Sequence, residues 1–193
     1  KAVSRARFLG LVAGGAVLGF GGMRVWGRAV KSWRYNTVER PVPKFDPAEY
    51  RLVIDGMVER PVTLTYDELR ALPAVRQVSD FQCVAGWGVE NVLWDGVRLQ
   101  TLIDLVQPVS KAKYVTFHSM GGVYRDSLSL QQARLPDALV AYDMEGEPLT
   151  QQHGLPLRLV MPRMFGYKGP KWLTRIEFLD LQAYRDKMIA GLP

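Results

Sequence analysis

The chain contains a single cysteine, Cys83, so no intrachain disulfide can stabilise its fold. A lone thiol serves in packing, in metal ligation or in covalent chemistry. Cys83 lies in the stretch Phe-Gln-Cys-Val-Ala-Gly-Trp at residues 81–87. A lone cysteine is more often a small buried hydrophobe than a ligand. Because Gly86 and Trp87 follow it in a polar, turn-rich context, we nevertheless predict an accessible thiol and favour ligation.

A basic, glycine-containing segment at residues 162–171 points to an anionic ligand. It ends in Lys168, Gly169, Pro170 and Lys171, and a glycine between cations lets backbone N–H groups approach an anion closely. Either lysine could equally be an ordinary surface residue. Arg158 stands in an otherwise apolar run, where a charge needs an anionic ligand or a buried carboxylate as its partner. A soft thiolate together with a phosphate cradle suggests a metal carried by a phosphorylated cofactor.

The two histidines, His118 and His153, show no metal-ligand spacing with each other or with Cys83. We therefore expect no zinc site. One of the histidines could donate a hydrogen bond to an anionic ligand.

The 193 residues are enough for one domain with a sizeable core, and their pattern predicts an α+β fold. Two Ser/Thr-x-x-Glu/Gln capping boxes open short helices, at Thr65 and at Ser129. Residues 99–106 have helical spacing that stops before Pro108. We predict strands at residues 50–56, with 62–64 as a continuation, at 75–82, at 91–97 with a turn, and at 114–119, 138–142, 155–161 and 172–181.

The N-terminal segment differs from the rest in charge and hydropathy. Residues 1–38 contain seven Lys and Arg and no acid, and residues 8–23 contain no charge. As a helix this run would span about 24 Å, close to the roughly 30 Å of a bilayer core if flanking side chains extend it. A cleaved export signal and a retained anchor both fit. We favour the anchor, since no small-x-small cleavage site follows and the glycines form two Gly-x-x-x-Gly patterns.

Charge counting alone does not fix which side of the membrane the domain faces. The remaining chain has 18 Lys and Arg against 19 Asp and Glu, so nothing in it indicates nucleic-acid binding. We divide the chain into an anchor or uncleaved signal (1–34), a proline-containing linker that wraps the domain edge (35–49) and a folded domain (50–193).

Four motifs in this order resemble the molybdopterin-binding domain of the sulfite oxidase family. They are the cysteine stretch 81–87, the Leu-Trp-Asp-Gly-Val-Arg-Leu stretch 93–99, the stretch 153–162 and the stretch 165–172. The resemblance is greatest to the bacterial branch that includes periplasmic methionine sulfoxide reductases, and it covers about residues 35–185. It implies the fold of that domain, mixed β-sheets with short helices, and the cofactor molybdenum-molybdopterin.

The resemblance also implies roles for individual residues. Cys83 matches the cysteine whose thiolate binds molybdenum, which suits a soft metal. The other matched positions would contact the pterin or hold its phosphate. They are Asn36, Ser119, His153, Arg158, Lys168, Gly169, Pro170 and Lys171.

Two departures narrow the expected activity. The sulfite oxidases proper have an arginine-containing stretch after their cysteine, and residues 84–88 lack it, which argues against sulfite as substrate. No Cys-x-x-Cys-His haem motif is present, so electrons would be exchanged with another protein. The immunoglobulin-like domain that follows in those enzymes is not expected in this chain.

We therefore expect an oxidoreductase that transfers an oxygen atom to or from a small or sulfoxide-type substrate. It would be held in the lipid by a single N-terminal span, with its domain on the extracytoplasmic, periplasmic side, and would use a haem- or quinone-linked membrane subunit as redox partner. The alternative is a cofactor-poor accessory subunit of a membrane electron-transfer complex.

Overall fold

The protein is described by a computed structural model over residues 33–190. Two five-stranded sheets form the domain, one with the strand order β2-β1-β10-β5-β6 and the other with β3-β4-β7-β8 and β9 added beside β7. The strands are β1 Leu52–Gly56, β2 Val62–Leu64, β3 Ala74–Gln82, β4 Gly88–Arg98, β5 Tyr114–Ser119, β6 Arg125–Ser129, β7 Leu139–Met144, β8 Glu147–Pro148, β9 Arg158–Val160 and β10 Leu173–Leu179. The helices are α2 Tyr66–Arg70, α3 Leu99–Val106, α4 Leu130–Ala133 and α5 Leu181–Ala190, with the short 3-10 turns η1 Gln151–His153 and η2 Gly166–Lys168.

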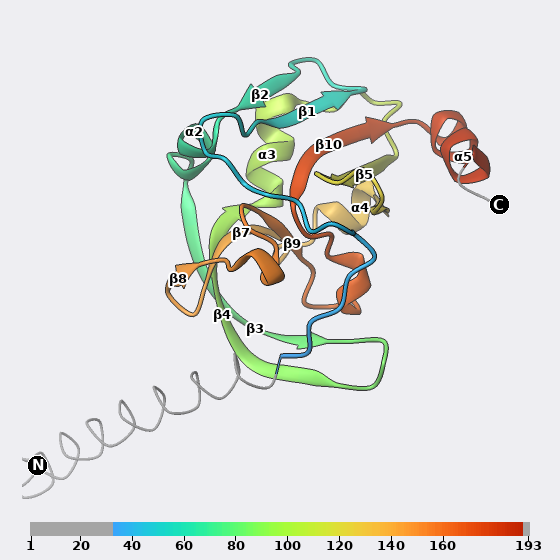
Figure 1. The fold of residues 1–193 in the computed structure, drawn as a ribbon. Helices are drawn as coiled ribbons and strands as arrows, with labels where there is room; N and C mark the ends of the chain where they lie inside the picture. Colours follow the sequence, from blue (N-terminus) through green and yellow to red (C-terminus); the bar gives the residue numbers. More distant parts are fainter. Residues whose placement is uncertain (1–32, 191–193) are drawn as a thin grey trace, which may run out of the picture.

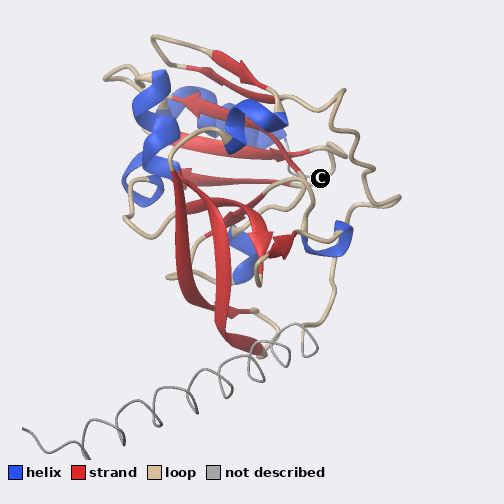
Figure 2. Ribbon diagram, turned by 90° about the vertical axis from the view of Figure 1, so that its left-hand side faces the viewer, coloured by secondary structure: helices blue, strands red, loops and turns tan. Residues whose placement is uncertain are grey.

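The first sheet is mixed, because β1 pairs parallel with β10 while its other pairs are antiparallel. In Figure 1 this sheet occupies the upper part of the molecule, and the long β3–β4 hairpin curves below it. Both sheets and α3 contribute to the main core, which contains Ile54, Val97, Ile103, Val140 and Phe178. Figure 2 shows the strands of the long hairpin running along one side of the domain. The α+β prediction is thus confirmed.

The predicted helix starts are confirmed in atomic detail. Thr65 accepts a hydrogen bond from the backbone N–H of Glu68, and the Glu68 carboxylate accepts one from the backbone N–H of Thr65. Ser129 and Gln132 form the same reciprocal pair at α4. Each box satisfies two N–H groups that a helix start would otherwise leave without partners. The helical spacing of residues 99–106 is also confirmed, since the four apolar residues at that spacing, Leu99, Leu102, Ile103 and Val106, are all buried, whereas Leu105 is exposed.

Three strand predictions were wrong in detail. Residues 62–64 do not continue the first strand but reverse and pair antiparallel with it. Residues 91–97 contain no turn, because β4 runs from Gly88 through to Arg98. The predicted strand 155–161 is shortened to Arg158–Val160, since Pro156 has no N–H group to donate to a ladder.

Besides the two-residue strand β8 and the 3-10 turns η1 and η2, the sequence pattern missed β6 and α5. β6 is a polar edge strand without apolar alternation. α5 has no continuous apolar stripe, and two apolar residues on it, Leu181 and Met188, are exposed. It is held instead by stacking of Tyr184 on Tyr114, with ring centroids 4.0 Å apart, and by the ion pair of Lys187 with Glu177.

The segment before β1 contains no helix or strand from residue 33 to residue 49, yet it packs along the domain. Glu39 is 1% exposed, and the Phe45 ring lies edge-on to Tyr50 and Tyr66. No helix between residues 33 and 190 is long and apolar enough to cross a membrane. The stretch 8–23, on which the anchor prediction depends, lies outside the described residues.

Gly96, which we had placed in a turn, is instead a point of close contact between two strands. A Cβ atom there would collide with the carbonyl oxygen of Val140 and would lie 2.7 Å from the Cα of Ala141. We expect Gly96→Ala to destabilise the protein by about 1–3 kcal/mol, the usual cost of overpacking. Chemical denaturation measures this, with the exposed Thr63→Ala as a control that should stay within about 0.5 kcal/mol of wild type. If the two variants were equally stable, that result would contradict the close contact between β4 and β7 at Gly96.

Candidate cofactor-binding site

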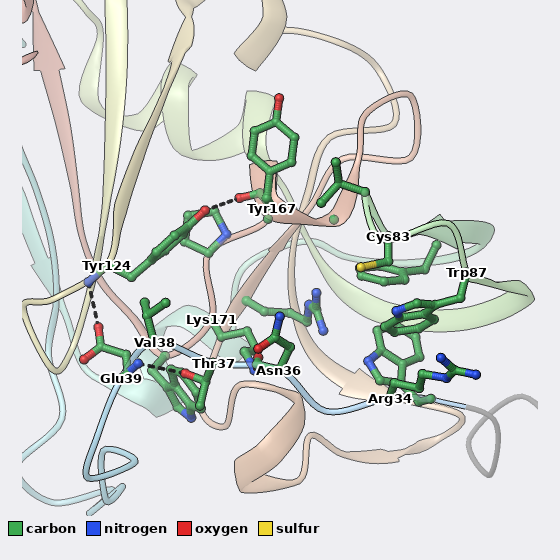
Figure 3. Close-up of a pocket in the computed structure, with 18 residues that line it drawn as sticks. Arg34, Asn36, Thr37, Val38, Glu39, Cys83, Trp87, Tyr124, Tyr167 and Lys171 are labelled. Atoms are coloured by element: carbon green, nitrogen blue, oxygen red, sulfur yellow. Dashed lines mark hydrogen bonds between the residues drawn. The ribbon is translucent and has the colours of Figure 1, made fainter.

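One pocket brings together four segments that are far apart in the sequence. Its walls come from the N-terminal segment 33–39, from the turn after β3 that carries Cys83 and Trp87, from Arg158 of β9, and from the loop 166–172. Figure 3 shows side chains from these segments facing a common space. The two sequence features that we had linked, the thiol and the basic loop, therefore meet at one site.

Cys83 is placed by the end of β3. Its N–H group donates to the carbonyl of Trp87 at 2.8 Å, and its carbonyl accepts from Gly86 at 3.1 Å, which closes a tight turn. The side chain is a free, partly buried thiol on the pocket wall, so the predicted accessibility is confirmed. Among the described residues, no group of three or more His, Cys, Asp or Glu side chains is placed to share a metal ion. A metal at Cys83 would therefore need most of its ligands from a cofactor.

Arg158 forms the buried floor of the pocket. It is 3% exposed, and its guanidinium carbon lies 5.2–5.5 Å from the ring centroids of Trp33, Phe81 and Trp94. One terminal nitrogen donates to the carbonyl of His153 at 3.2 Å, whereas Nε has no partner within the described part of the chain. Burial lowers the pKa of Arg158 to about 10, so the group stays charged at neutral pH. Of the two predicted partners, the described structure provides no carboxylate, which favours an anionic ligand.

Lys171 supplies a second cation without a carboxylate among the described residues. Its Nζ donates to the backbone carbonyls of Asn36 at 2.8 Å and of Gln152 at 3.1 Å. It also lies 4.5 Å from the ring centroids of Tyr35 and Trp172. Burial, and secondly the charge of Arg158, lower the pKa of Lys171 to about 7.

Gly169 and Pro170 hold the basic loop against β9. A Cβ atom on Gly169 would collide with the carbonyl oxygen of Leu159, and the carbonyl of Pro170 accepts from the N–H of Leu159 at 2.9 Å. Both residues lie on the pocket wall, as does Asn36. The loop therefore reaches the pocket by close backbone contact that only glycine permits.

Three predicted residues lie outside this wall. Lys168 does not face the pocket but forms an ion pair with Asp126 at 2.9 Å and donates to the carbonyl of Ser127 at 3.2 Å. Ser119 is 2% exposed, and its hydroxyl has no partner among the described residues. His153 supports Arg158 through its carbonyl, while burial, Arg158 and Lys171 lower the pKa of its ring to about 4. The His153 ring is thus neutral and unsuited to pairing with an anion.

The motifs did not identify several residues that complete the site. Trp33 lies against Phe81, with ring centroids 4.3 Å apart, and covers Arg158. Glu39 accepts from the N–H of Tyr124 at 2.9 Å, and a Cβ atom on Gly121 would collide with its carboxylate. Only weak signals in the sequence pointed to Glu39, which is an acid next to a basic segment, and to the glycine pair after β5 that lies against it.

The thiol of Cys83 and the cations of the pocket fit a phosphorylated metal cofactor. A thiolate is a soft ligand suited to molybdenum. The buried Arg158 and the partly buried Lys171, which have no acidic partners among the described residues, suit a phosphate, since an anion there would relieve their desolvation. The orphaned Nε of Arg158 is the specific observation that asks for an acceptor.

Comparisons with known proteins agree with this geometry. Residues 39–185 match the model of the oxidoreductase molybdopterin binding domain. The oxidoreductase YuiH of Bacillus subtilis is 34% identical over 133 residues, covering 69% of this chain and 67% of YuiH. The protein-methionine-sulfoxide reductase catalytic subunit MsrP of Gluconobacter oxydans is 35% identical over 153 residues, covering 70% of this chain and 49% of that protein.

Among solved structures, the sulfane dehydrogenase SoxCD of Paracoccus pantotrophus has a TM-score of 0.67 at 24% identity, over 72% of this chain and 40% of that one. This likeness concerns the fold alone. The chain spans about half the length of the MsrP relative and less of SoxCD. The chain belongs to the family of molybdopterin-binding oxidoreductase domains, with the sulfite oxidase-type fold and molybdenum-molybdopterin as the family's cofactor.

Proposed function

We propose that this chain is a membrane-anchored oxidoreductase acting on a sulfoxide-type substrate, with Cys83 as the protein ligand of molybdenum. The observation that carries the proposal is one pocket lined by the thiol and by three cations, Arg34, Arg158 and Lys171, which form no ion pair with an acid among the described residues. When bound, the cofactor supplies two-electron oxygen-atom transfer. The chain's own residues bind it, orient it and neutralise its charge.

The pocket divides these tasks between its two sides. Cys83 would hold the metal end, next to the half-buried Trp87. Arg158 and Lys171 would hold the anionic end, with Gly169 and Pro170 bringing backbone close to it. Asn36 also lines the pocket, and its carbonyl connects the N-terminal segment to Lys171. Ser119, His153 and Lys168 do not line the pocket and would affect the cofactor only through the residues that do.

The residues that directly follow Cys83 in the chain favour a neutral substrate, and the cation on this side of the pocket, Arg34, comes from the N-terminal segment (Figure 3). After Cys83 the chain contributes Val84, which is 66% exposed, and Trp87, where a sulfite-binding site would need cations. A sulfoxide is neutral and can use apolar contacts, and the MsrP relatives are named as reductases of methionine sulfoxide in proteins. We extend that substrate class to this chain.

The N-terminal part of the proposal comes from the sequence. We propose that residues 1–34 form a membrane anchor, that 35–49 link it to the domain 50–193, and that the domain lies on the periplasmic side. Electrons would come from a separate haem- or quinone-linked membrane subunit. Trp33 and Arg34, the last two residues of this anchor range, line the pocket, so the membrane-embedded part of the anchor would end before them.

The thiol is tested by Cys83→Ala and Cys83→Ser in the full chain. Because neither side chain is a soft ligand, we expect both variants to fold, to lose molybdenum and to lose sulfoxide reduction by at least about 100-fold. Metal analysis, a melting curve and turnover with a chemical reductant measure this. Unaltered turnover would contradict the assignment. A wild-type protein with bound partners but no molybdenum would support the accessory-subunit alternative instead.

The two lysines offer a matched pair. Lys171→Gln removes a charge from the pocket, so we expect cofactor binding to weaken about tenfold or more. Lys168→Gln removes the partner of Asp126 outside the pocket, so we expect a loss of about 0.5–1 kcal/mol in stability with the cofactor retained. Pterin and molybdenum content per folded chain separate the two effects, and a reversed pattern would overturn both roles.

A pH series adds a second readout for Lys171. With its pKa at about 7, Lys171 must take up a proton to bind an anion at higher pH, whereas below pH 7 it is already charged. The other groups facing it, Arg158 and neutral His153, do not titrate between pH 6 and pH 9. Cofactor retention should therefore fall as the pH rises above 7 in wild type, and should stay flat over that range in Lys171→Gln.

The anchor is tested by fractionating cells that express the full chain. We expect the wild-type protein to stay with membranes after alkaline carbonate washing, and Leu11→Arg with Val17→Arg to release it, because each central charge costs about 2.5–3.5 kcal/mol. Protease treatment of spheroplasts should digest the domain if it faces the periplasm. Recovery of the wild-type protein in the soluble fraction would rule out the anchor.

A further inference from the structure

Two buried side-chain N–H groups in the described part of the domain lack acceptors, and both residues line the same small cavity. These donors are Nε of Arg158 and Nε1 of Trp94, which have no partner among the residues that the structure describes. Trp94 is 1% exposed. Both side chains line a second, smaller cavity, which shares Phe81, Arg158 and two glycines of the basic loop with the main pocket. The smaller cavity is thus a continuation of the pocket behind Phe81.

The protein walls of this cavity offer the donors little. Most of its other residues are apolar, among them Val160 and Met161. The acid on this wall, Asp80, uses one carboxylate oxygen to accept from the N–H of Asn91 at 2.8 Å. Because buried donors without acceptors are rare in folded proteins, the acceptor is expected to come from an ordered water or from a bound group.

The charge beside the cavity selects the kind of acceptor. The Arg158 guanidinium lies 5.2 Å from the ring centroid of Trp94 and has no carboxylate partner in the described structure. An anionic oxygen there would meet a cation and an N–H group at once. A phenylalanine would give the arginine the same aromatic contact, so the indole N–H is the feature that packing alone does not explain.

We propose that Trp94 is a further cofactor-binding residue, whose indole N–H donates a hydrogen bond to an anionic oxygen at the phosphate end of molybdopterin, next to Nε of Arg158. The inference rests on the proposed function, because it needs the phosphate to lie on the Arg158 side of the pocket. It adds a neutral donor to the two cations. The shared chemistry is that of a phosphate oxygen, which free inorganic phosphate could also supply.

The experiment compares Trp94→Phe with Tyr50→Phe in the full chain. Tyr50 is the control because it is also buried and aromatic but lines neither the pocket nor the smaller cavity, and its hydroxyl donates to the carbonyl of Leu173 at 2.5 Å. We expect Trp94→Phe to lose pterin about tenfold faster on dialysis, which corresponds to about 1.4 kcal/mol, and Tyr50→Phe to retain it per folded chain. Fluorescence of the released, oxidised pterin measures the loss without relying on activity.

A second measurement uses wild-type protein and does not depend on how the variants fold. The indole N–H signals of the tryptophans, labelled with 15N, are recorded with and without the cofactor. We expect the Trp94 proton to move downfield when the cofactor binds. An unmoved Trp94 signal, or equal pterin retention in the two variants, would overturn the inference.

Two further arms separate the inference from the proposals on which it rests. If Trp94→Phe retains pterin while Arg158→Gln loses it, the phosphate site stands and the role of Trp94 fails. If wild type contains no pterin, the proposed function itself fails. Millimolar phosphate is also added to cofactor-free protein, and a Trp94-dependent rise in melting temperature combined with unchanged pterin retention would assign the site to free phosphate and overturn the inference.

Discussion

The pocket depends on a positive charge placed inside the protein without a negative one beside it. Arg158 is carried into the interior by β9, whose other two residues are apolar and which pairs with the largely apolar strand β7. The fold lowers the cost of this burial with three aromatic rings and one carbonyl, but leaves Nε without an acceptor in the described structure. A carboxylate partner would stabilise the empty protein and remove its attraction for an anion. Because the charge of Arg158 is buried and not neutralised, we expect the domain to be most stable with an anion bound.

The basic loop shows how two similar residues acquire different roles from their surroundings. Lys168 and Lys171 are three positions apart, yet the turn η2 directs them to different neighbours. Lys168 meets Asp126 of β6, which fixes the loop to the first sheet together with the bond from the Tyr124 hydroxyl to the carbonyl of Tyr167. Lys171 meets only carbonyls and rings, so no acid among the described residues neutralises it when it is protonated. Because the ion pair of Lys168 with Asp126 fixes the loop, it also determines the position of Lys171.

Local sequence signals predicted the elements whose causes are local. The capping boxes at Thr65 and Ser129 and the apolar spacing of α3 depend on residues within one or two turns, and all three are found. The prediction for Gly96 was wrong because a glycine is required there by close contact with β7, a strand more than 40 positions away in the chain. Likewise, the meeting of Cys83 with Arg158 and Lys171 was suggested by chemistry and by family resemblance, whereas Trp33 and Glu39 lie in the site only through tertiary packing.

The segment before the domain contributes more to the site than its composition suggests. The family match begins at residue 39, but the pocket wall already begins at Trp33. Glu39 fixes one end of the stretch 33–39 to the loop after β5, and the Trp33 ring holds the other end over Arg158. Between them the Asn36 carbonyl accepts from Lys171, so Arg158 and Lys171 both contact this stretch. The Lys171 ammonium has three N–H donors and uses two of them on the carbonyls of Asn36 and Gln152, so a phosphate could accept from the third. The position of this stretch and occupancy of the pocket are therefore coupled through the same ammonium group.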